Sequence, residues 1–274
     1  MAWLEASSKV VTGLSRPTGR RALLLLALLA GLAGAWPWRD VPGNWWEAAS
    51  GRRPLWAAKT WHYQLDMIDV DRMVAAEGDV MVSDYARAEG RGPLTREEVG
   101  RLKRGSDGRP RIVVSYLSIG EAEEYRYYWR DDWKTPDTQA WDVAENCAWP
   151  KAHMVRFWHD AWKDIVIRGP QSYLKRIIDA GFDGVYLDRI DVYEHQSEPG
   201  RDLRDEMIAF VTELSAIAKR LKPGFLVIAQ NAEDLLSERR YRRVIDGLGK
   251  EDLLYGVAGT AKRNRPKEVG WALG

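Results

Sequence analysis

Three segments of the chain combine a short apolar run with a carboxylate that follows it, and these carboxylates could carry out acid/base chemistry. The segments cover residues 113–121, 184–191 and 225–233, and they supply Glu121, Asp188 and Glu233. Carboxylates at the C-terminal ends of successive parallel strands converge on one mouth of an α/β barrel, where barrel enzymes hold their active sites. Converging carboxylates without dedicated metal ligands favour cleavage of a glycosidic bond.

We predict that Asp188, Glu233 and Glu121 are catalytic, with Asp188 as nucleophile or base and Glu233 or Glu121 as the acid. Asp188 ends a buried strand, where an unpaired charge is costly unless it has a task or a partner. The alternative for Asp188 is an ion pair with a nearby arginine. Glu233 could equally be a carboxylate at a helix N-terminus, and Glu121 could belong to a solvated acidic loop with Glu123 and Glu124.

Polar and aromatic side chains near the same strand ends are expected to bind the substrate. Arg156 either orients a carboxylate or is a structural charge inside the barrel, and Asp191 is as well suited to capping a helix or contacting a sugar as to catalysis. For Glu251 and Asp252 a solvated loop is a simpler interpretation than the rim of the site. The predicted substrate-binding residues are Asp84, Tyr116, Arg156, Tyr186, Asp191, Gln230 and Asn231.

Several other classes of function find no support in the sequence. The formal net charge is +1, and no concentrated basic stripe suggests a nucleic-acid binder. The four histidines show no metal-ligand spacing, and neither a Gly-x-Ser-x-Gly elbow nor a phosphate loop is present. We therefore expect no metal and no cofactor. The 14 Trp and 11 Tyr, against 4 Phe, suit both ordinary cores and stacking on sugar faces, for which Trp158 and Tyr193 are further candidates.

The N-terminus resembles an export signal. Arg16, Arg20 and Arg21 precede an apolar run at residues 22–32, and small residues follow at 33–35. This layout is typical of a secretory signal peptide, and the run is shorter than the ~20 residues of a membrane span. Residues 1–35 are therefore predicted to be a signal peptide or an uncleaved anchor that tethers the protein through residues 22–35. Either one places the protein outside the cytoplasm, secreted or periplasmic.

The rest of the chain alternates between strand-like and helix-like segments. Expected strands lie at residues 61–65, 80–84, 111–118, 153–158, 184–188, 225–230 and 244–248, and expected helices at 70–76, 95–104, 161–180, 203–221 and 234–241. Such repeated βα units predict a TIM-type (β/α)8 barrel over residues 59–256, after a linker or arm at 36–58. The tail, 257–274, is irregular and basic; it supplies a poor eighth βα unit or leaves the barrel open. We expect a monomer.

Four motifs make the chain similar to the endo-α-1,4-polygalactosaminidase-like glycoside hydrolases, glycoside hydrolase family 114. The motifs lie at residues 116–123, 180–188, 230–231 and 251–256, and the resemblance extends from about residue 61 to 256. It implies a TIM-type barrel, export from a bacterial cell and action on an amino-sugar polysaccharide. Members usually continue through an eighth βα unit, which this sequence does not visibly do.

Two hypotheses follow. The first is an exported glycoside hydrolase that cleaves an amino-sugar-containing polysaccharide by carboxylate acid/base catalysis. The second is a non-catalytic barrel that binds polysaccharide at the cell envelope, keeping the stacking aromatic residues without the acid/base geometry.

Overall fold

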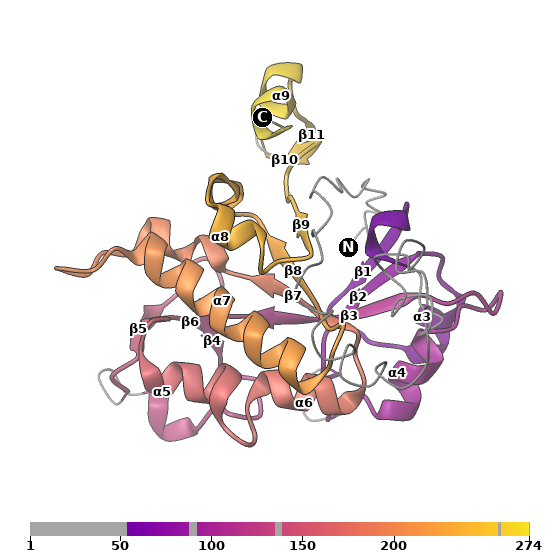
Figure 1. Ribbon diagram of the computed structural model, residues 1–274, viewed down its shortest axis with the longest axis horizontal. Helices are drawn as coiled ribbons and strands as arrows, with labels where there is room; N and C mark the ends of the chain where they lie inside the picture. The colour runs from indigo at the N-terminus through magenta and orange to yellow at the C-terminus, as the bar shows by residue number, and fades with distance from the viewer. Residues whose placement is uncertain (1–53, 88–91, 135–138, 257–258, 274) are drawn as a thin grey trace, which may run out of the picture.

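The centre of the molecule is a six-stranded, fully parallel sheet. The computed structural model describes residues 54–87, 92–134, 139–256 and 259–273. The sheet has the order β1-β2-β3-β7-β8-β9 (Figure 1). Its strands are β1 (Trp61–Gln64), β2 (Val80–Ser83), β3 (Ile112–Ser118), β7 (Gly184–Asp188), β8 (Leu226–Gln230) and β9 (Gly247–Gly249). Six of the seven expected strands are therefore confirmed as members of one parallel sheet.

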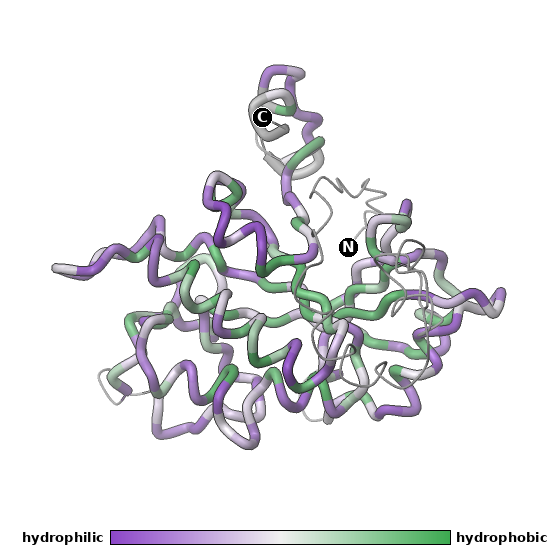
Figure 2. The backbone as a smooth tube through the Cα atoms, in the orientation of Figure 1, coloured by the Kyte–Doolittle hydropathy of each residue, from purple (hydrophilic) through white to green (hydrophobic). Residues whose placement is uncertain are grey.

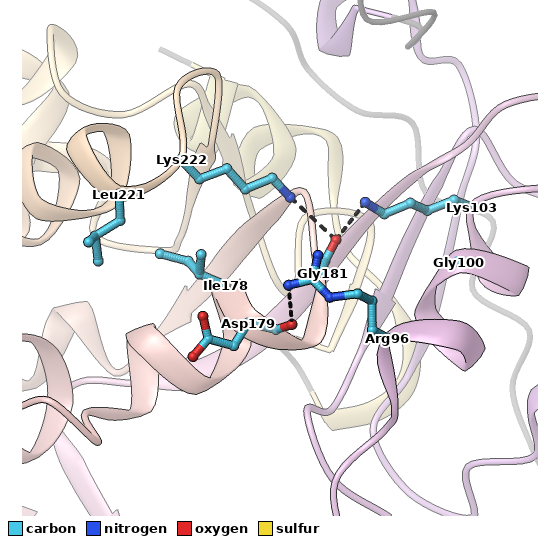
Figure 3. Close-up of a pocket in the computed structure, with 8 residues that line it drawn as sticks. All are labelled: Arg96, Gly100, Lys103, Ile178, Asp179, Gly181, Leu221 and Lys222. Atoms are coloured by element: carbon cyan, nitrogen blue, oxygen red, sulfur yellow. Dashed lines mark hydrogen bonds between the residues drawn. The ribbon is translucent and has the colours of Figure 1, made fainter.

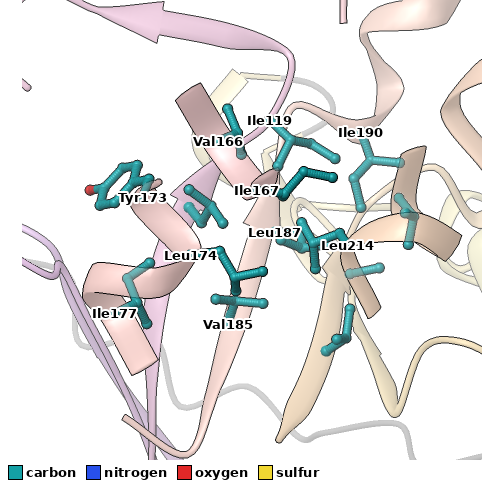
Figure 4. Close-up of a cluster of buried hydrophobic side chains, with 14 of the residues drawn as sticks. Ile119, Val166, Ile167, Tyr173, Leu174, Ile177, Val185, Leu187, Ile190 and Leu214 are labelled. Carbon is teal, nitrogen blue, oxygen red and sulfur yellow. The ribbon is translucent and has the colours of Figure 1, made fainter. Parts of the chain in front are cut away.

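Helices cover one face of this sheet, and the principal core lies between the two layers. The helices are α3 (Val70–Ala75), α4 (Arg96–Leu102), α5 (Asp160–Lys163), α6 (Tyr173–Ala180), α7 (Leu203–Leu221) and α8 (Arg239–Arg242). Leu187 and Val185 of β7 pack there against Leu174 of α6 and Leu214 of α7 (Figure 4). The central strands are hydrophobic along their length (Figure 2). Burial on both faces explains these continuous apolar runs.

The opposite face of the sheet, here called the inner face, carries a smaller apolar cluster. Successive side chains of a strand point to opposite faces, so Val114 and Tyr186 lie on the inner face while their neighbours Val113 and Val185 face the helices. Leu55, in the short 3-10 helix η1 (Leu55–Ala57), packs against the inner cluster. The sheet therefore has the curvature of a half-barrel with a partly filled interior.

An aspartate immediately before a strand fixes the register with the neighbouring strand in three places. Asp183 accepts a hydrogen bond from the Val113 amide at 3.2 Å, and Asp246 accepts one from the Val227 amide at 2.8 Å. Asp79 does the same for the chain just before β1. These carboxylates satisfy an amide donor at the start of the adjacent strand, which would otherwise need another partner.

Helix ends follow local sequence rules. Thr95 and Glu98 form the expected capping box at the start of α4. The helix α7 matches its expected range, and Asp202 caps it. Gly181 ends α6 in the left-handed region at φ 99°, a conformation that glycine adopts without steric cost.

The expected strand at 153–158 is real, but its place in the barrel was wrong. β6 (Ala152–Val155) pairs antiparallel with β4 (Glu121–Glu123) and β5 (Asp142–Glu145) in a separate three-stranded sheet. β3 pairs directly with β7 instead. An apolar run predicts a strand, but the pairing partner depends on long-range contacts that periodicity does not contain.

Two expected helices are interrupted. The helix predicted at 161–180 consists of α5, a π-helical segment at Asp164–Arg168 and α6, with Gly169 and Pro170 between the last two. Proline lacks an amide donor and disfavours helical backbone in the residue before it. The helix predicted at 234–241 divides into the 3-10 helix η5 (Glu233–Ser237) and α8, with Glu238 in extended conformation between them.

After β9 the chain leaves the sheet. β10 (Tyr255–Gly256) and β11 (Gly259–Arg263) form an antiparallel pair, and α9 (Pro266–Leu273) follows; together they stand clear of the parallel sheet (Figure 1). Within residues 54–87, 92–134, 139–256 and 259–273, no further parallel strand joins β1 to β9. The expected signal segment, 1–35, and most of the expected arm lie outside the described residues. Among the helices that are described, none has the length and hydropathy needed to cross a bilayer.

Candidate active site

Asp188 lies at the carboxyl end of β7 and accepts hydrogen bonds from three directions. The Tyr116 hydroxyl, from β3, donates to its Oδ2 at 2.6 Å. The Gln230 side-chain amide, at the end of β8, donates to Oδ1 at 2.9 Å, and the Arg189 backbone amide donates to the same oxygen at 2.7 Å. Side chains alternate between the two faces along a strand, and those of Tyr116, Asp188 and Gln230 all belong to the inner face. The parallel register of β3, β7 and β8 therefore brings them together.

Burial dominates the protonation of this carboxyl. Desolvation raises the pKa of Asp188 to about 6, the hydrogen bonds from Tyr116 and the Arg189 amide oppose the rise, and the negative charge of Glu251 adds to it. The three donors suit the ionised form, since a carboxylate accepts hydrogen bonds and donates none. Burial therefore outweighs the donors: the pKa of Asp188 lies above its usual value although the hydrogen bonds themselves favour the anion.

Left-handed backbone follows two of the strands at this end. Arg189, after β7, has φ 59°, and Asn231 and Ala232, after β8, have φ 56° and φ 52°. Such conformations are uncommon for residues other than glycine and cluster at functional sites. They turn the chain sharply enough for the amide of Arg189 to reach the carboxylate of the residue before it.

The predicted catalytic residue Glu121 lies in β4, buried and held by one hydrogen bond and one ion pair. Its Oε1 accepts from the Asn146 side chain at 2.7 Å and lies 2.9 Å from Arg189 Nε. The preceding Gly120 is pressed against the backbone of Arg189, where a Cβ would lie 2.3 Å from the carbonyl oxygen. Asp191 lies 4.0 Å from the same arginine. This geometry makes Glu121 an anchor for Arg189.

The predicted acid Glu233 lies in η5, where its Oε1 is 3.1 Å from Lys250 Nζ. A different carboxylate, Glu251, acts electrostatically on Asp188. The Asn231 side chain makes two hydrogen bonds with Glu251. Its Nδ2 donates to Oε2 at 2.9 Å, and its Oδ1 accepts from the Glu251 backbone amide at 3.0 Å. The sequence signal for Glu251 was available, because it is the first carboxylate after the β9 strand, as Asp84 is after β2.

Asp84, at the end of β2, is buried in a charged cluster. Arg126 donates to its Oδ1 at 2.7 Å and to Glu123 Oε2 at 2.6 Å, and the Tyr125 hydroxyl also donates to Glu123. Arg126 was missed in the sequence, because it follows β4 in a segment that was expected to be a loop. One cation therefore serves two carboxylates beside Tyr116.

Aromatic rings form the floor of the inner face. Trp61, Tyr63 and Tyr186 pack with ring centroids 5.7 to 5.8 Å apart, and Tyr63 is 40% exposed. Burial raises the pKa of the Tyr63 hydroxyl, and the negative charges of Asp188, Glu251, Asp84 and Glu123 raise it further. Gly249 of β9 leaves room for Tyr186, because a Cβ there would lie 2.3 Å from its hydroxyl oxygen. An exposed ring among four carboxylates suits a polar, cationic ligand.

The remaining predicted residues lie elsewhere. Arg156 donates to the backbone carbonyls of Ala140 and Asp142, at 2.9 and 2.8 Å, and so supports the antiparallel sheet. The Tyr193 hydroxyl donates to Asp234, and Trp158 packs on Phe157. The described part of the chain holds no group of three or more His, Cys, Asp or Glu side chains suited to a metal ion.

A pocket at the opposite end of the sheet is separate from this site. Its lining residues come from α4, the end of α6 and the end of α7 (Figure 3). The side chains of Lys103 and Lys222 point together at the Gly181 carbonyl oxygen. These lysines satisfy carbonyls at the C-terminus of α6, which is an ordinary way to end a helix.

Comparison with known proteins identifies relatives over most of the chain. The model of the glycoside-hydrolase family GH114 matches residues 41–256. An uncharacterised protein of Methanocaldococcus jannaschii is 36% identical over 204 residues, which cover 71% of this chain and 56% of that protein. An uncharacterised protein of Thermotoga maritima is 35% identical over 202 residues, which cover 71% of this chain and 60% of the relative. The chain thus spans little more than half the length of these relatives.

Solved structures share the fold at low sequence identity. The glycoside hydrolase domain of PelA from Pseudomonas aeruginosa has a TM-score of 0.58 at 17% identity, with 79% of this chain and 78% of that chain covered. Aspergillus fumigatus Ega3, solved in complex with galactosamine, has a TM-score of 0.52 at 20% identity, with 71% and 67% covered.

Proposed function

The chain belongs to glycoside-hydrolase family GH114, and on that premise we propose that it hydrolyses glycosidic bonds in a galactosamine-containing polysaccharide. The observation that carries the proposal is Asp188, a buried carboxylate held by three donors at the mouth of the half-barrel and subject to the negative charge of a second carboxylate, Glu251. Two carboxylates flanking a bond are the usual machinery of glycoside hydrolysis.

Asp188 acts in its ionised form, as nucleophile or as the base that activates water. A carboxyl whose pKa is about 6 is about 90% ionised at pH 7. Tyr116, Gln230 and the Arg189 amide hold its oxygens in place, so the group needs little reorganisation during the reaction.

Glu251 is the proposed acid, in place of Glu233 or Glu121. It protonates the leaving glycosidic oxygen, and Asn231 fixes its position. Glu233 and Glu121 are each paired with a cation, Lys250 and Arg189. A carboxylate already engaged by a cation suits a structural role better than contact with the leaving oxygen.

The charge of the site supports a cationic sugar. Arg126 supplies one positive charge for Asp84 and Glu123, while Asp188 and Glu251 add two further carboxylates around Tyr63. A surplus of negative charge attracts an ammonium group and opposes a carboxylated sugar. The galactosamine bound to the fold relative Ega3 is a sugar of this chemistry.

The test is release of new reducing ends from partly de-N-acetylated polygalactosamine, with the fully N-acetylated polymer as the specificity control. We expect product from the wild type, none from Asp188→Asn, and a large loss in Glu251→Gln. The matched variant Glu233→Gln should retain most activity. A dead Glu233→Gln with an active Glu251→Gln would overturn the assignment of the acid. Saturable heat of binding without new reducing ends would instead indicate the non-catalytic polysaccharide binder.

Export is a second part of the proposal. The basic, apolar and small-residue order of residues 16–35 supports a signal peptide or anchor. N-terminal sequencing of protein recovered from the periplasm or medium should find a start near residue 36 if the segment is removed. Recovery of all the protein from the cytoplasm would contradict export.

A further inference from the structure

Arg126 is a buried cation that the proposed reaction does not use directly. Its side chain is only 4% exposed. It follows β4 of the antiparallel sheet and binds Glu123 of that sheet and Asp84 at the end of β2 of the parallel sheet. The guanidinium fork therefore joins two sheets whose strands come from distant parts of the chain.

Three tyrosine rings surround this guanidinium. Its central carbon lies 4.7 Å from the ring centroid of Tyr125, 5.3 Å from that of Tyr173 and 5.9 Å from that of Tyr116. Guanidinium groups at such distances are attracted to aromatic rings, and the attraction is larger where water is excluded. Tyr116 is the ring that carries the consequence, because its hydroxyl donates to Asp188 Oδ2 at 2.6 Å.

We propose that Arg126 is a positioning residue for the reaction: it fixes the Tyr116 ring so that the hydroxyl reaches Asp188. Arginine binds Asp84 and Glu123 through two nitrogens of one planar guanidinium, whose orientation is thereby fixed beside the ring, whereas lysine offers a compact ammonium on a flexible stem. The part of this proposal that is measured by kcat and KM rests on the hydrolase function proposed above. A purely structural role, tying the two sheets together, is the alternative.

The experiment compares Arg126→Lys, Tyr116→Phe and the double variant with wild type. Arg126→Lys keeps the charge and removes the fork. Arg130→Lys is the matched control, because Arg130 pairs with Asp132 at the surface, where both side chains are more than 60% exposed. The readouts are kcat and KM on the polymer, and the pKa of Asp188 followed without substrate by carboxyl ¹³C NMR, assigned with Asp188→Asn.

We expect Arg126→Lys to lower kcat about tenfold with little change in KM, as loss of a hydrogen bond to a charged group would do. The pKa of Asp188 should rise, as in Tyr116→Phe, because the ionised form loses a donor. The double variant should be no worse than Tyr116→Phe alone. Arg130→Lys should match wild type in both readouts.

Two results would overturn the proposal: unchanged kcat and Asp188 pKa in Arg126→Lys, whatever its stability, or fully additive effects in the double variant. If Arg126→Lys does not fold, Tyr125→Phe replaces it, because Tyr125 is 47% exposed and its hydroxyl binds Glu123 beside Arg126. It should shift the Asp188 pKa in the same direction by a smaller amount, and an unchanged pKa would refute the positioning role.

A wild type that releases no product would refute the hydrolase function alone, since the NMR titration still decides the role of Arg126.

Discussion

The two ends of strand β7 each carry an aspartate, and the two aspartates have opposite surroundings. Asp183, just before the strand, is 1% exposed and lies 2.7 Å from Lys103 Nζ and 3.8 Å from Lys222 Nζ. Asp188, at the end of the strand, binds neutral donors instead and has a carboxylate, Glu251, as its electrostatic neighbour. The amino end of the strand pairs its aspartate with lysines, whereas the cations at the carboxyl end pair with other carboxylates and leave Asp188 to neutral donors.

This difference teaches how to separate structural from functional acids in such a fold. A buried carboxylate paired with lysines is stabilised in the folded state, and removing its charge deprives the lysines of their ion-pair partner. A buried carboxylate subject to the charge of another carboxylate is kept at a cost in stability, which makes it a candidate for a functional group. Substitutions at both aspartates and around them test this contrast, and they are given in decreasing order of expected effect.

The largest effect compares Asp188→Asn with Asp183→Asn. Asp188→Asn should lower kcat/KM at least about a thousandfold while the protein stays folded, since it removes the anion and keeps the side-chain shape. Asp183→Asn should lower the free energy of unfolding by about 3 kcal/mol with little change in kcat, because it leaves two lysines without their buried partner. Urea unfolding and initial rates on the same samples would measure both. Equal losses of stability in the two variants would remove the contrast.

The substitution Gly249→Ala should have the next largest effect. A Cβ at Gly249 would lie 2.3 Å from the Tyr186 hydroxyl and 3.0 Å or less from its ring, so the ring must move. We expect a destabilisation of about 2 kcal/mol, typical of overpacking, together with reduced activity, because Tyr186 lies on the floor of the site. Gly247→Ala is the matched control. Its Cβ would lie 3.2 Å from the end of the Leu55 side chain and at an ordinary contact distance, 3.7 Å, from Ile228, so thermal unfolding should show a smaller change.

The third prediction concerns pH. The pKa of Asp188 is raised to about 6, so kcat/KM should rise as the pH increases through about 6 and the carboxyl ionises. The same shift means that the folded state binds this proton more tightly than the unfolded chain does. Its contribution to stability is therefore full below about pH 4 and is lost as the pH rises through about 6.

The stability part of that prediction can be isolated by substitution. Asp188→Asn should be more stable than wild type at pH 7 by about 1 kcal/mol, with the gain disappearing toward pH 4. Denaturant titrations of both proteins at several pH values would show this convergence. A gain that is constant with pH, or a loss at pH 7, would contradict the inferred burial of charge.

The smallest effect tests a feature outside both ends of β7. Thr95→Ala removes the side chain that accepts from the Glu98 amide at the start of α4. Loss of this cap should cost about 1 kcal/mol of stability and leave kcat unchanged. A change in kcat would show that α4 is coupled to the site, and the separation between the structural and functional regions would then fail.

Local patterns in the sequence were enough to identify most elements and to single out three side chains of the candidate site. Apolar runs predicted β2, β3, β7 and β8, and the polar residues at their ends drew attention to Asp188, Tyr116 and Gln230, which the structure brings together. These predictions rest on interactions between neighbours in the chain, or on the rule that parallel strands present their carboxyl ends at one edge.

Other features depended on pairing. The strand at 152–155 has the same apolar character as its neighbours, yet it belongs to the antiparallel sheet. Glu233 and Glu251 both follow strands, and only their partners, Lys250 and Asn231, separate a neutralised carboxylate from one that acts on Asp188. Arg126 gave no sequence signal, because its importance comes from residues brought to it by two different sheets.

By itself the sequence therefore determined the alternation of strands and helices, the family motifs and the acidic character of the strand ends, because each is encoded over a few consecutive residues. The tertiary structure alone decided which strands are adjacent, which carboxylates keep their charge unpaired, and which cation supports them. Those outcomes depend on distances between side chains far apart in the chain, and electrostatic and hydrogen-bond energies change steeply over such distances.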